Sequence, residues 1–149
     1  MKKFAVVSMI LVSLSGCASG PKFSDVSGVE WKLTDVKIAD KNINFDRAKL
    51  TADGFAQIFT LTFNTDRISG TGSPNKYFAP YTLGKKLAIT VQPVAGTLMA
   101  SILTQPEKLK ENDFFTYISN TYEWNLVDGK LELHSKTADG KDVVLIFVR

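Results

Sequence analysis

The chain has 149 residues with a formal net charge of +3 at pH 7, and its 44% hydrophobic share is enough for the core of one domain. The single cysteine excludes an intramolecular disulfide. The small net charge argues against a nucleic-acid-binding protein, which needs a basic face to neutralise phosphates.

The first 16 residues have the features of a secretory signal peptide. Lys2 and Lys3 precede an apolar run, 4–14, that is too short to span a bilayer as a stable helix. The run ends in Leu-Ser-Gly-Cys17, which is similar to the lipobox of bacterial lipoproteins: small residues fit the peptidase cleft, and the cysteine thiolate accepts a diacylglyceryl group. We predict cleavage before Cys17 and lipidation of Cys17. The alternative is an ordinary secretory signal with an incidental cysteine.

Lipidation would attach the mature chain to a membrane, because each buried methylene contributes about 0.8 kcal/mol. Ala18, and not an aspartate, follows Cys17; by resemblance to Gram-negative lipoproteins this implies transfer to the outer membrane. Removal of both leader lysines reduces the 18 basic residues to 16, against 15 acidic ones. We expect residues 17–28 to form a short lipidated tether and residues 29–149 to form one domain.

From residue 29 onward, apolar and polar residues mostly alternate, as in half-buried strands. The first predicted strand carries Trp31 and Leu33 and continues past a twist or bulge to residue 38. We assign no helix or strand to residues 41–54, which are polar and end in a turn. A second strand covers residues 58–63, and a turn at residues 64–66 leads to a partner strand that begins at Arg67.

The middle of the chain predicts two further strands and one helix. The strands cover residues 77–83 and 87–91, and residues 97–99 are expected to pack in the core before the helix. Thr104-Gln-Pro-Glu107 forms a capping box at the helix start. The expected buried face consists of Leu109, Phe114, Phe115 and Ile118, and the expected solvent face consists of Lys108, Lys110, Glu111 and Asp113.

The last third predicts a meander of three strands. Asp128-Gly129 is a two-residue hairpin signal, and Ala138-Asp-Gly140 marks a second turn. The last strand, 143–148, is apolar on both faces, which predicts a central or barrel position. We therefore expect an α+β fold: a mainly antiparallel, strongly bent sheet or partial barrel with one helix packed on it.

A turn-rich stretch, GTGSPNKYFAPY at residues 70–81, is the main candidate for a binding site. Its glycines permit positive φ or close packing, and Asn75 can bond nearby backbone. One interpretation is a structural corner covered by aromatic side chains. The other is a ligand or peptide groove lined by Asn75, Tyr77 and Tyr81.

The search for catalytic chemistry identifies no constellation. His134 is the lone histidine and alternates outward on its strand, and a zinc site would need carboxylates that show no ligand spacing. Ser69 and Ser73 lack the nucleophile elbow, and the glycines at 70–72 lack a dinucleotide fingerprint. We expect no catalytic residues, no metal and no cofactor. A hydrolase that uses two of the scattered aspartates stays an open alternative.

The order of several motifs resembles the META/HslJ domain over residues 29–149. The motifs are WKL at 31–33, LTF at 61–63, ISGTGSPNKYFAPYTL at 68–83, LAIT at 87–90, TLMA at 97–100, LELHS at 131–135 and VLIFVR at 144–149. The matches to the central signature are Gly72, Asn75, Tyr77, Tyr81, Thr97 and Met99. Two cysteines common in relatives are replaced by Ser73-Pro74 and Ser101, which argues against a redox role.

The resemblance implies links to heat-shock response, novobiocin resistance, secretion or motility, but it implies no molecular activity. We expect a monomeric, non-enzymatic envelope module that contacts the membrane through its lipid, binds an envelope protein partner or supports the envelope under stress, and binds no nucleic acid. The alternative is an inhibitor or small-ligand carrier with a pocket at the barrel mouth.

Overall fold

The structure is a computed structural model that describes residues 19–99 and 109–149. The predictions on Cys17, Ser101 and the capping box at residues 104–107 lie outside these residues. The strands are β1 (Glu30–Ile38), β2 (Lys41–Asn44), β3 (Thr60–Phe63), β4 (Arg67–Thr71), β5 (Lys76–Leu83), β6 (Ile89–Val91), β7 (Ala95–Gly96), β8 (Glu123–Val127), β9 (Lys130–Lys136) and β10 (Asp142–Val148). The helices are the 3-10 helix η1 (Phe23–Asp25), α1 (Arg47–Ala52) and α2 (Glu111–Ser119).

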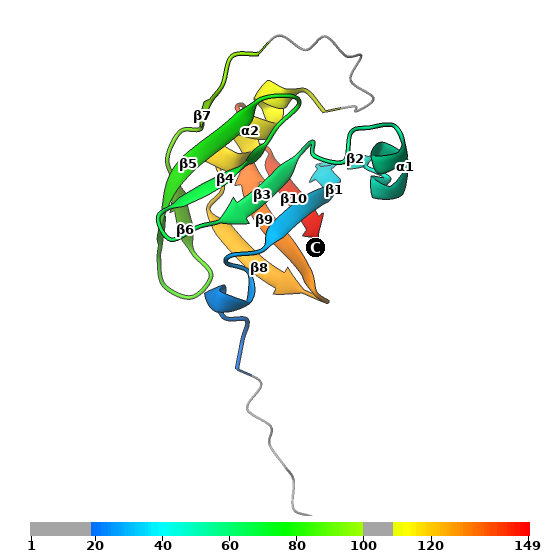
Figure 1. Cartoon of the computed structure of the whole chain (residues 1–149). Helices are drawn as coiled ribbons and strands as arrows, with labels where there is room; N and C mark the ends of the chain where they lie inside the picture. Colours follow the sequence, from blue (N-terminus) through cyan, green and yellow to red (C-terminus); the bar gives the residue numbers. More distant parts are fainter. Residues whose placement is uncertain (1–18, 100–108) are drawn as a thin grey trace, which may run out of the picture.

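The strands form one antiparallel sheet that nearly closes into a barrel (Figure 1). The order is β6-β5-β4-β3-β1-β10-β9-β8, while β2 pairs with β1 and β7 pairs with β5. The edge strands meet through two main-chain hydrogen bonds, from Ile89 N to Tyr122 O at 3.1 Å and from Trp124 N to Leu87 O at 3.0 Å. The predicted fold class is therefore confirmed.

Local sequence patterns explain the main strands. Trp31 and Leu33 are fully buried on β1, and the strand has a bulge between Leu33 and Asp35, where the register with β10 shifts. β10 lies between β1 and β9, as its two apolar faces predicted. Asp128 and Gly129 have φ values of 51° and 76°, which is the left-handed turn that the hairpin signal predicted.

Aromatic side chains fill the barrel and both of its ends. At one end, α2 places Phe114 against Phe59, with ring centroids 5.0 Å apart. At the other end, η1 places Phe23 against Phe63 and Trp124, at 5.1 and 5.2 Å. Figure 1 shows α2 and η1 at opposite ends of the sheet. The largest fully buried side chains are Trp31, Phe59, Phe63, Phe114, Phe147, Leu33, Leu61, Ile68, Ile118, Leu131, Leu133 and Leu145.

The expected boundary at residue 29 is displaced, because residues 23–28 belong to the folded domain. Val26 is fully buried, and its carbonyl accepts a hydrogen bond from Trp31 Nε1 at 2.9 Å. The end of the chain lies beside the same segment: Arg149 Nη2 donates to Asp25 O at 2.9 Å, and its guanidinium lies 5.1 Å from the centre of the Trp31 ring. Among the described residues, only 19–22 therefore remain as tether before η1.

Residues 41–54 contain elements that the sequence analysis left unassigned. They form β2 and α1, and the Asp46 side chain caps α1 by accepting from Lys49 N at 3.0 Å. Arg47 donates to Ile58 O at 3.0 Å and to Ala56 O at 2.7 Å. Burial lowers the pKa of Arg47 from its ordinary value. These bonds fasten α1 to the segment that leads into β3.

Two expectations about burial are wrong. Leu98 is fully exposed and Met99 is 59% exposed, so residues 97–99 do not pack in the core. Glu111, expected on the solvent face of α2, is partly buried and bonded to the chain before β5.

The predicted apolar face of α2 is confirmed for Phe114 and Ile118, which are buried, and Phe115 is partly buried. Leu109 is buried but precedes the helix, which begins at Glu111 with Lys110 as its N-cap, so the predicted helix is too long at its start.

No helix among the described residues is long and apolar enough to cross a membrane.

Candidate functional site

The stretch at residues 70–81 divides into strand, corner and strand. Gly70 and Thr71 still belong to β4, the corner covers residues 72–75, and β5 begins at Lys76. A Cβ on Gly70 would lie 2.0 Å from Thr60 O, and one on Gly72 would lie 2.6 Å from a carboxylate oxygen of Glu111. The two glycines therefore permit close packing, which is one of the two roles expected of them.

The corner is fastened to α2 by the carboxylate of Glu111. Its Oε1 accepts from the main-chain N–H groups of Ser73 and Asn75, the latter at 2.7 Å. Its Oε2 accepts from Asn75 Nδ2 at 2.7 Å. A carboxylate that accepts several N–H bonds makes charge-assisted hydrogen bonds, which are stronger than neutral ones. Glu111 thus ties the corner to the start of the helix.

Asn75 has no hydrogen-bonding capacity left for a ligand. Besides Glu111, its Nδ2 reaches Met99 O at 3.3 Å, while its Oδ1 accepts from Met99 N at 2.6 Å and from Thr97 Oγ1 at 2.9 Å. An asparagine amide has two N–H donors and an oxygen with two lone pairs, and all of them are in use. The main chain of Met99 and the Thr97 hydroxyl thus hold Asn75, although residues 97–99 are exposed.

Tyr77 is a buried structural residue. Its side chain is 3% exposed, its hydroxyl donates to Thr60 O at 2.8 Å, and its ring packs against Phe114 with centroids 5.7 Å apart. Burial raises the pKa of Tyr77 far above its ordinary value. Asn75 and Tyr77 therefore support the structural-corner interpretation and do not line a common groove with Tyr81.

Tyr81 lines an open cleft at the η1 end of the barrel. The cleft has a volume of about 720 Å³. Its lining residues are Phe23, Ser27, Gly28, Phe63, Asn64, Thr65, Tyr81, Thr82 and Leu83. They come from η1 and the turn after it, from the end of β3 and the turn that follows it, and from the end of β5. A volume in the range of about 300–1,000 Å³ is usual for small-ligand sites.

The wall of the cleft is a cluster of aromatic rings. The Phe63 ring is fully buried and lies 5.1 Å from Phe23 and 5.5 Å from Tyr81. The Tyr81 hydroxyl donates to Asn64 O at 2.5 Å, which fixes the ring against the turn after β3. Burial, and then the nearby charge of Asp66, raise the pKa of Tyr81. The Tyr81 phenol therefore stays neutral at physiological pH.

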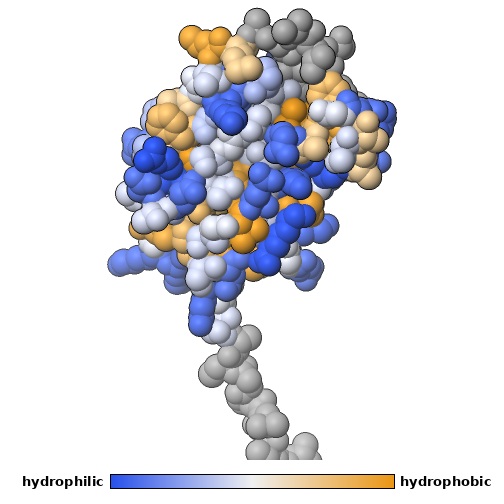
Figure 2. All heavy atoms as spheres, in the orientation of Figure 1, coloured by the Kyte–Doolittle hydropathy of each residue, from blue (hydrophilic) through white to orange (hydrophobic). Residues whose placement is uncertain are grey.

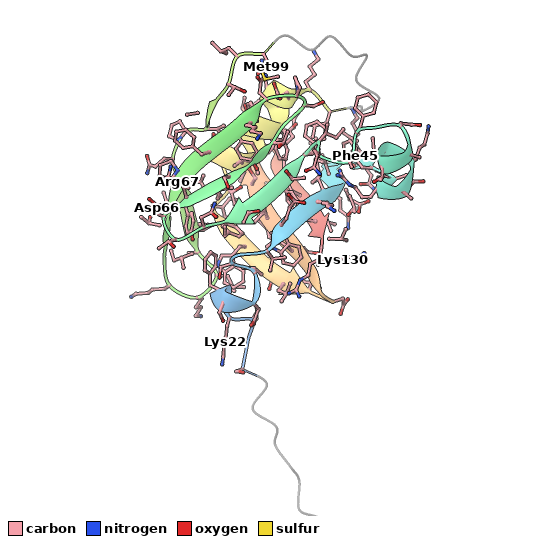
Figure 3. The ribbon with its side chains drawn as sticks, viewed as in Figure 1. Lys22, Phe45, Asp66, Arg67, Met99 and Lys130 are labelled. Atoms are coloured by element: carbon pink, nitrogen blue, oxygen red, sulfur yellow. The ribbon has the colours of Figure 1, made fainter. Side chains whose placement is uncertain are left out.

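The cleft and the corner lie at opposite ends of the molecule. Figure 3 places Lys22, which precedes η1, at one end of the domain and Met99 at the other end, which carries α2. On the face in Figure 2, apolar patches alternate with hydrophilic residues, without one continuous apolar area. The N-terminal segment thus leaves the domain beside the cleft.

His134 and Ser69, two of the other sequence candidates, lie on separate strands of the sheet. His134 Nε2 lies 3.6 Å from the Glu132 carboxylate on β9, while Ser69 lies on β4, and three strands, β3, β1 and β10, separate β4 from β9 in the sheet. Within the described ranges, no group of three His, Cys, Asp or Glu side chains is arranged to hold a metal ion.

Comparisons with known proteins agree with this structure. A model of the META domain family matches residues 24–148. The chain belongs to this family. The match begins within η1, in agreement with the packed position of this META domain's first helix. No curated protein gives a significant match.

A solved structure similar to this META domain is the NMR structure of a protein from Burkholderia xenovorans. It has a TM-score of 0.56 and 17% sequence identity, and the match covers 99% of this chain and 98% of that chain. The likeness supports the fold.

Sequence reasoning missed most of the cleft. Phe23 was placed in the tether and residues 64–66 were treated only as a turn, so Tyr81 alone was identified. The available signal was the pair Phe23 and Val26 in an otherwise small and polar segment, because two large apolar residues three apart are typical of a short packed helix.

Proposed function

We propose that this META-domain protein is a lipid-anchored, non-enzymatic binding module of the bacterial cell envelope, monomeric, and located in the outer membrane if the organism is Gram-negative. Its binding site is the open cleft beside η1. The resemblance to HslJ-like proteins favours a role under envelope stress. The observation that carries the proposal is that the cleft lies at the same end of the barrel as Lys22, which follows Cys17 closely in the sequence.

The tether limits where the domain lies. Residues 18–22 span at most about 18 Å when fully extended. A lipid on Cys17 would therefore keep the η1 end, with its cleft, near the bilayer surface. The cleft would then meet components that lie at or near the membrane.

Two of the residues predicted to line a groove, Asn75 and Tyr77, are held in structural bonds, so the proposal rests on the cleft beside Tyr81. Glu111 and Asn75 bond one another and the corner, and Tyr77 bonds the backbone of β3. The lining of the cleft includes aromatic rings, hydroxyls, one amide and the exposed side chain of Leu83, a mixture of apolar and polar groups that is suited to holding a ligand.

A small-ligand carrier is the second candidate, and the volume of the cleft favours it. A carrier that encloses an apolar ligand needs a deep cavity, whereas here the large side chains of the barrel interior are fully buried against each other. The cleft is an open one at the barrel end. This open shape better fits a domain that binds part of a larger molecule at the rim of the cleft.

The anchor is tested by replacing Cys17→Ser and following the protein by fractionation and by mass spectrometry of native material. We expect the wild-type chain to carry acyl groups and to sediment with membranes, and the variant to keep its leader or to be released. An unmodified Cys17 in native wild-type protein would contradict the anchor.

The binding role is tested by a photo-crosslinking amino acid placed at Thr65, which lines the cleft, and at Thr51 on the exposed side of α1 as the matched control. Both positions are exposed, so neither change disturbs the core. We expect illumination of intact cells to give an adduct specific to position 65. The same products at both positions, or none at position 65, would contradict a binding role of the cleft.

A further inference from the structure

We propose that the cleft binds an uncharged oligosaccharide. This inference rests on the proposed function, since it names the ligand class of the same site. Three properties of the lining carry it: the absence of charged side chains, the packed aromatic wall, and the hydroxyl and amide groups around the rim.

The first property is the absence of a fixed charge. The side chains that line the cleft include no Asp, Glu, Lys, Arg or His, and the Tyr81 phenol is neutral. A nearby charge is that of Asp66, which lies outside the lining and, after burial, raises the pKa of Tyr81. Nearby main-chain donors are also in use: Gly28 N donates to Phe63 O at 2.9 Å, and Asn64 N donates to Arg67 O at 2.9 Å. The lining therefore offers no counter-charge to a phosphate, a carboxylate or an ammonium group.

The second property is an aromatic wall that is already in place. Phe23 and Tyr81 are half-buried and lie 5.7 Å apart, and both pack against the buried ring of Phe63. Neither ring has to be ordered when a ligand binds, which lowers the entropic cost of binding. The exposed parts of these rings suit the C–H faces of a pyranose, which are the apolar part of a sugar.

The third property is a rim of groups that both donate and accept hydrogen bonds. Ser27, Thr65 and Thr82 contribute hydroxyls, and Asn64 contributes an amide that is held by a 2.7 Å bond from its Nδ2 to Ser69 Oγ. Sugar hydroxyls have the same dual character. An acyl chain in this place would bury these polar groups without partners, at a cost of about 1–3 kcal/mol for each group.

The shape also favours a chain of sugar units. The cleft is open and has a volume of about 720 Å³, so an oligosaccharide could enter it and continue into solvent. A position near the bilayer would bring the cleft to sugars of glycolipids or of envelope polysaccharides. Both sources present the same neutral sugar chemistry.

The test uses the full-length lipidated protein in detergent micelles and its tryptophan fluorescence, because Trp124 lies 5.2 Å from Phe23. The probes are neutral tetrasaccharides of glucose, mannose, galactose and N-acetylglucosamine, with tetragalacturonate as the anionic counterpart. We expect a saturable response to at least one neutral tetrasaccharide and a weaker response to the anionic one. Neutral glycolipid in phosphatidylcholine vesicles, compared with the lipid alone, distinguishes the two sources.

Thr65→Arg fills the cleft with a long charged side chain at an exposed turn, and Thr51→Arg is the control on α1. We expect Thr65→Arg to weaken binding at least tenfold and Thr51→Arg to leave it unchanged. The inference is overturned if no neutral probe gives saturable binding, if the anionic probe binds more tightly, or if Thr65→Arg binds as wild type. If position 65 still gives its specific crosslink in cells, the binding role stands and only the ligand class fails.

Discussion

Single residues hold the corner at 72–75 in place, and Glu111 is the most important of them. Its carboxylate accepts three hydrogen bonds from the corner, so its removal leaves three polar groups without their partner. We predict that Glu111→Ala lowers the free energy of unfolding by about 3 kcal/mol, measured by urea denaturation. Asp113→Ala is the control, since Asp113 is an exposed acid in the same first turn of α2. Equal losses for the two variants would show that Glu111 acts only through the helix dipole.

Because Tyr77 is buried, we expect the free energy of unfolding of the domain to decrease as the pH rises into the alkaline range. Burial raises the pKa of Tyr77 in the folded state, so the folded chain keeps the phenol proton that the unfolded chain releases near pH 10. The stabilisation is complete below that pH and falls above it, by up to about 1.4 kcal/mol per pH unit for one proton.

We therefore predict that Tyr77→Phe reduces the loss of unfolding free energy between pH 9.5 and 11, although it lowers stability at pH 7 by about 1 kcal/mol through the lost bond to Thr60 O. Urea denaturation across this pH range is the measurement. An unchanged slope in the variant would exclude Tyr77 as the source. Tyr122→Phe, at a 45% exposed tyrosine, is the control.

The sequence predicted the position of Asn75 and Tyr77 in a structural corner but not their partners. The residue types of Gly72, Ser73 and Pro74 predict a turn, because turn preferences depend on residues that are adjacent in the sequence. The partners Glu111 and Thr60 lie 36 and 17 residues from Asn75 and Tyr77, and nothing local brings them together. A charged side chain near a helix start predicts a solvent position for Glu111. The structure instead satisfies its charge with the N–H groups of Ser73 and Asn75, which the local sequence does not reveal.

At the level of elements, β3 and β4 approach so closely that only glycine fits at position 70. A Cβ there would meet Thr60 O at 2.0 Å, and a strand backbone cannot move aside as a flexible side chain would. We predict that Gly70→Ala lowers the free energy of unfolding by about 3 kcal/mol. The check is chemical denaturation beside Gly20→Ala, where an added Cβ meets nothing within 4 Å. Wild-type stability of Gly70→Ala would contradict the close approach.

Strands in which apolar and polar residues alternate clearly could be predicted from the sequence. Short elements that are stabilised by a capping side chain could not. β1, β9 and β10 have apolar residues in a period of two or a continuous apolar run, so their type and burial follow from the sequence. α1 has only six residues and one buried side chain, Leu50, so it has no apolar periodicity to detect. Its stability comes from the Asp46 cap and the bonds of Arg47, which depend on the fold around it.

At the level of the whole molecule, η1 closes the second end of the barrel and belongs to the folding unit. A chain that begins at residue 29 lacks Phe23 and Val26, and the Trp31 indole loses its acceptor. We predict that residues 29–149 are less stable than residues 20–149 by about 4 kcal/mol, from the loss of a packed phenylalanine. Urea denaturation of the two chains is the comparison. Equal midpoints would place residues 23–28 outside the cooperative unit.

The fold class followed from the sequence because antiparallel meanders and hairpin turns are local features. The closure between β6 and β8 did not follow from the sequence, because its two main-chain hydrogen bonds join residues 87–89 to residues 122–124. The cleft also joins segments that are distant in the sequence, because it lies where η1, β3 and β5 meet.

The bond between Arg149 and the carbonyl of Asp25 brings the two ends of the folded chain into contact. A short peptide linker could therefore join them covalently, and the ring could be cut at the Asp128–Gly129 turn to give a circular permutant. By the same adjacency, a purification tag or fused protein attached after Arg149 would emerge next to the N-terminal segment of the domain and crowd it. Fusions inserted at the Asp139–Gly140 turn would avoid that crowding.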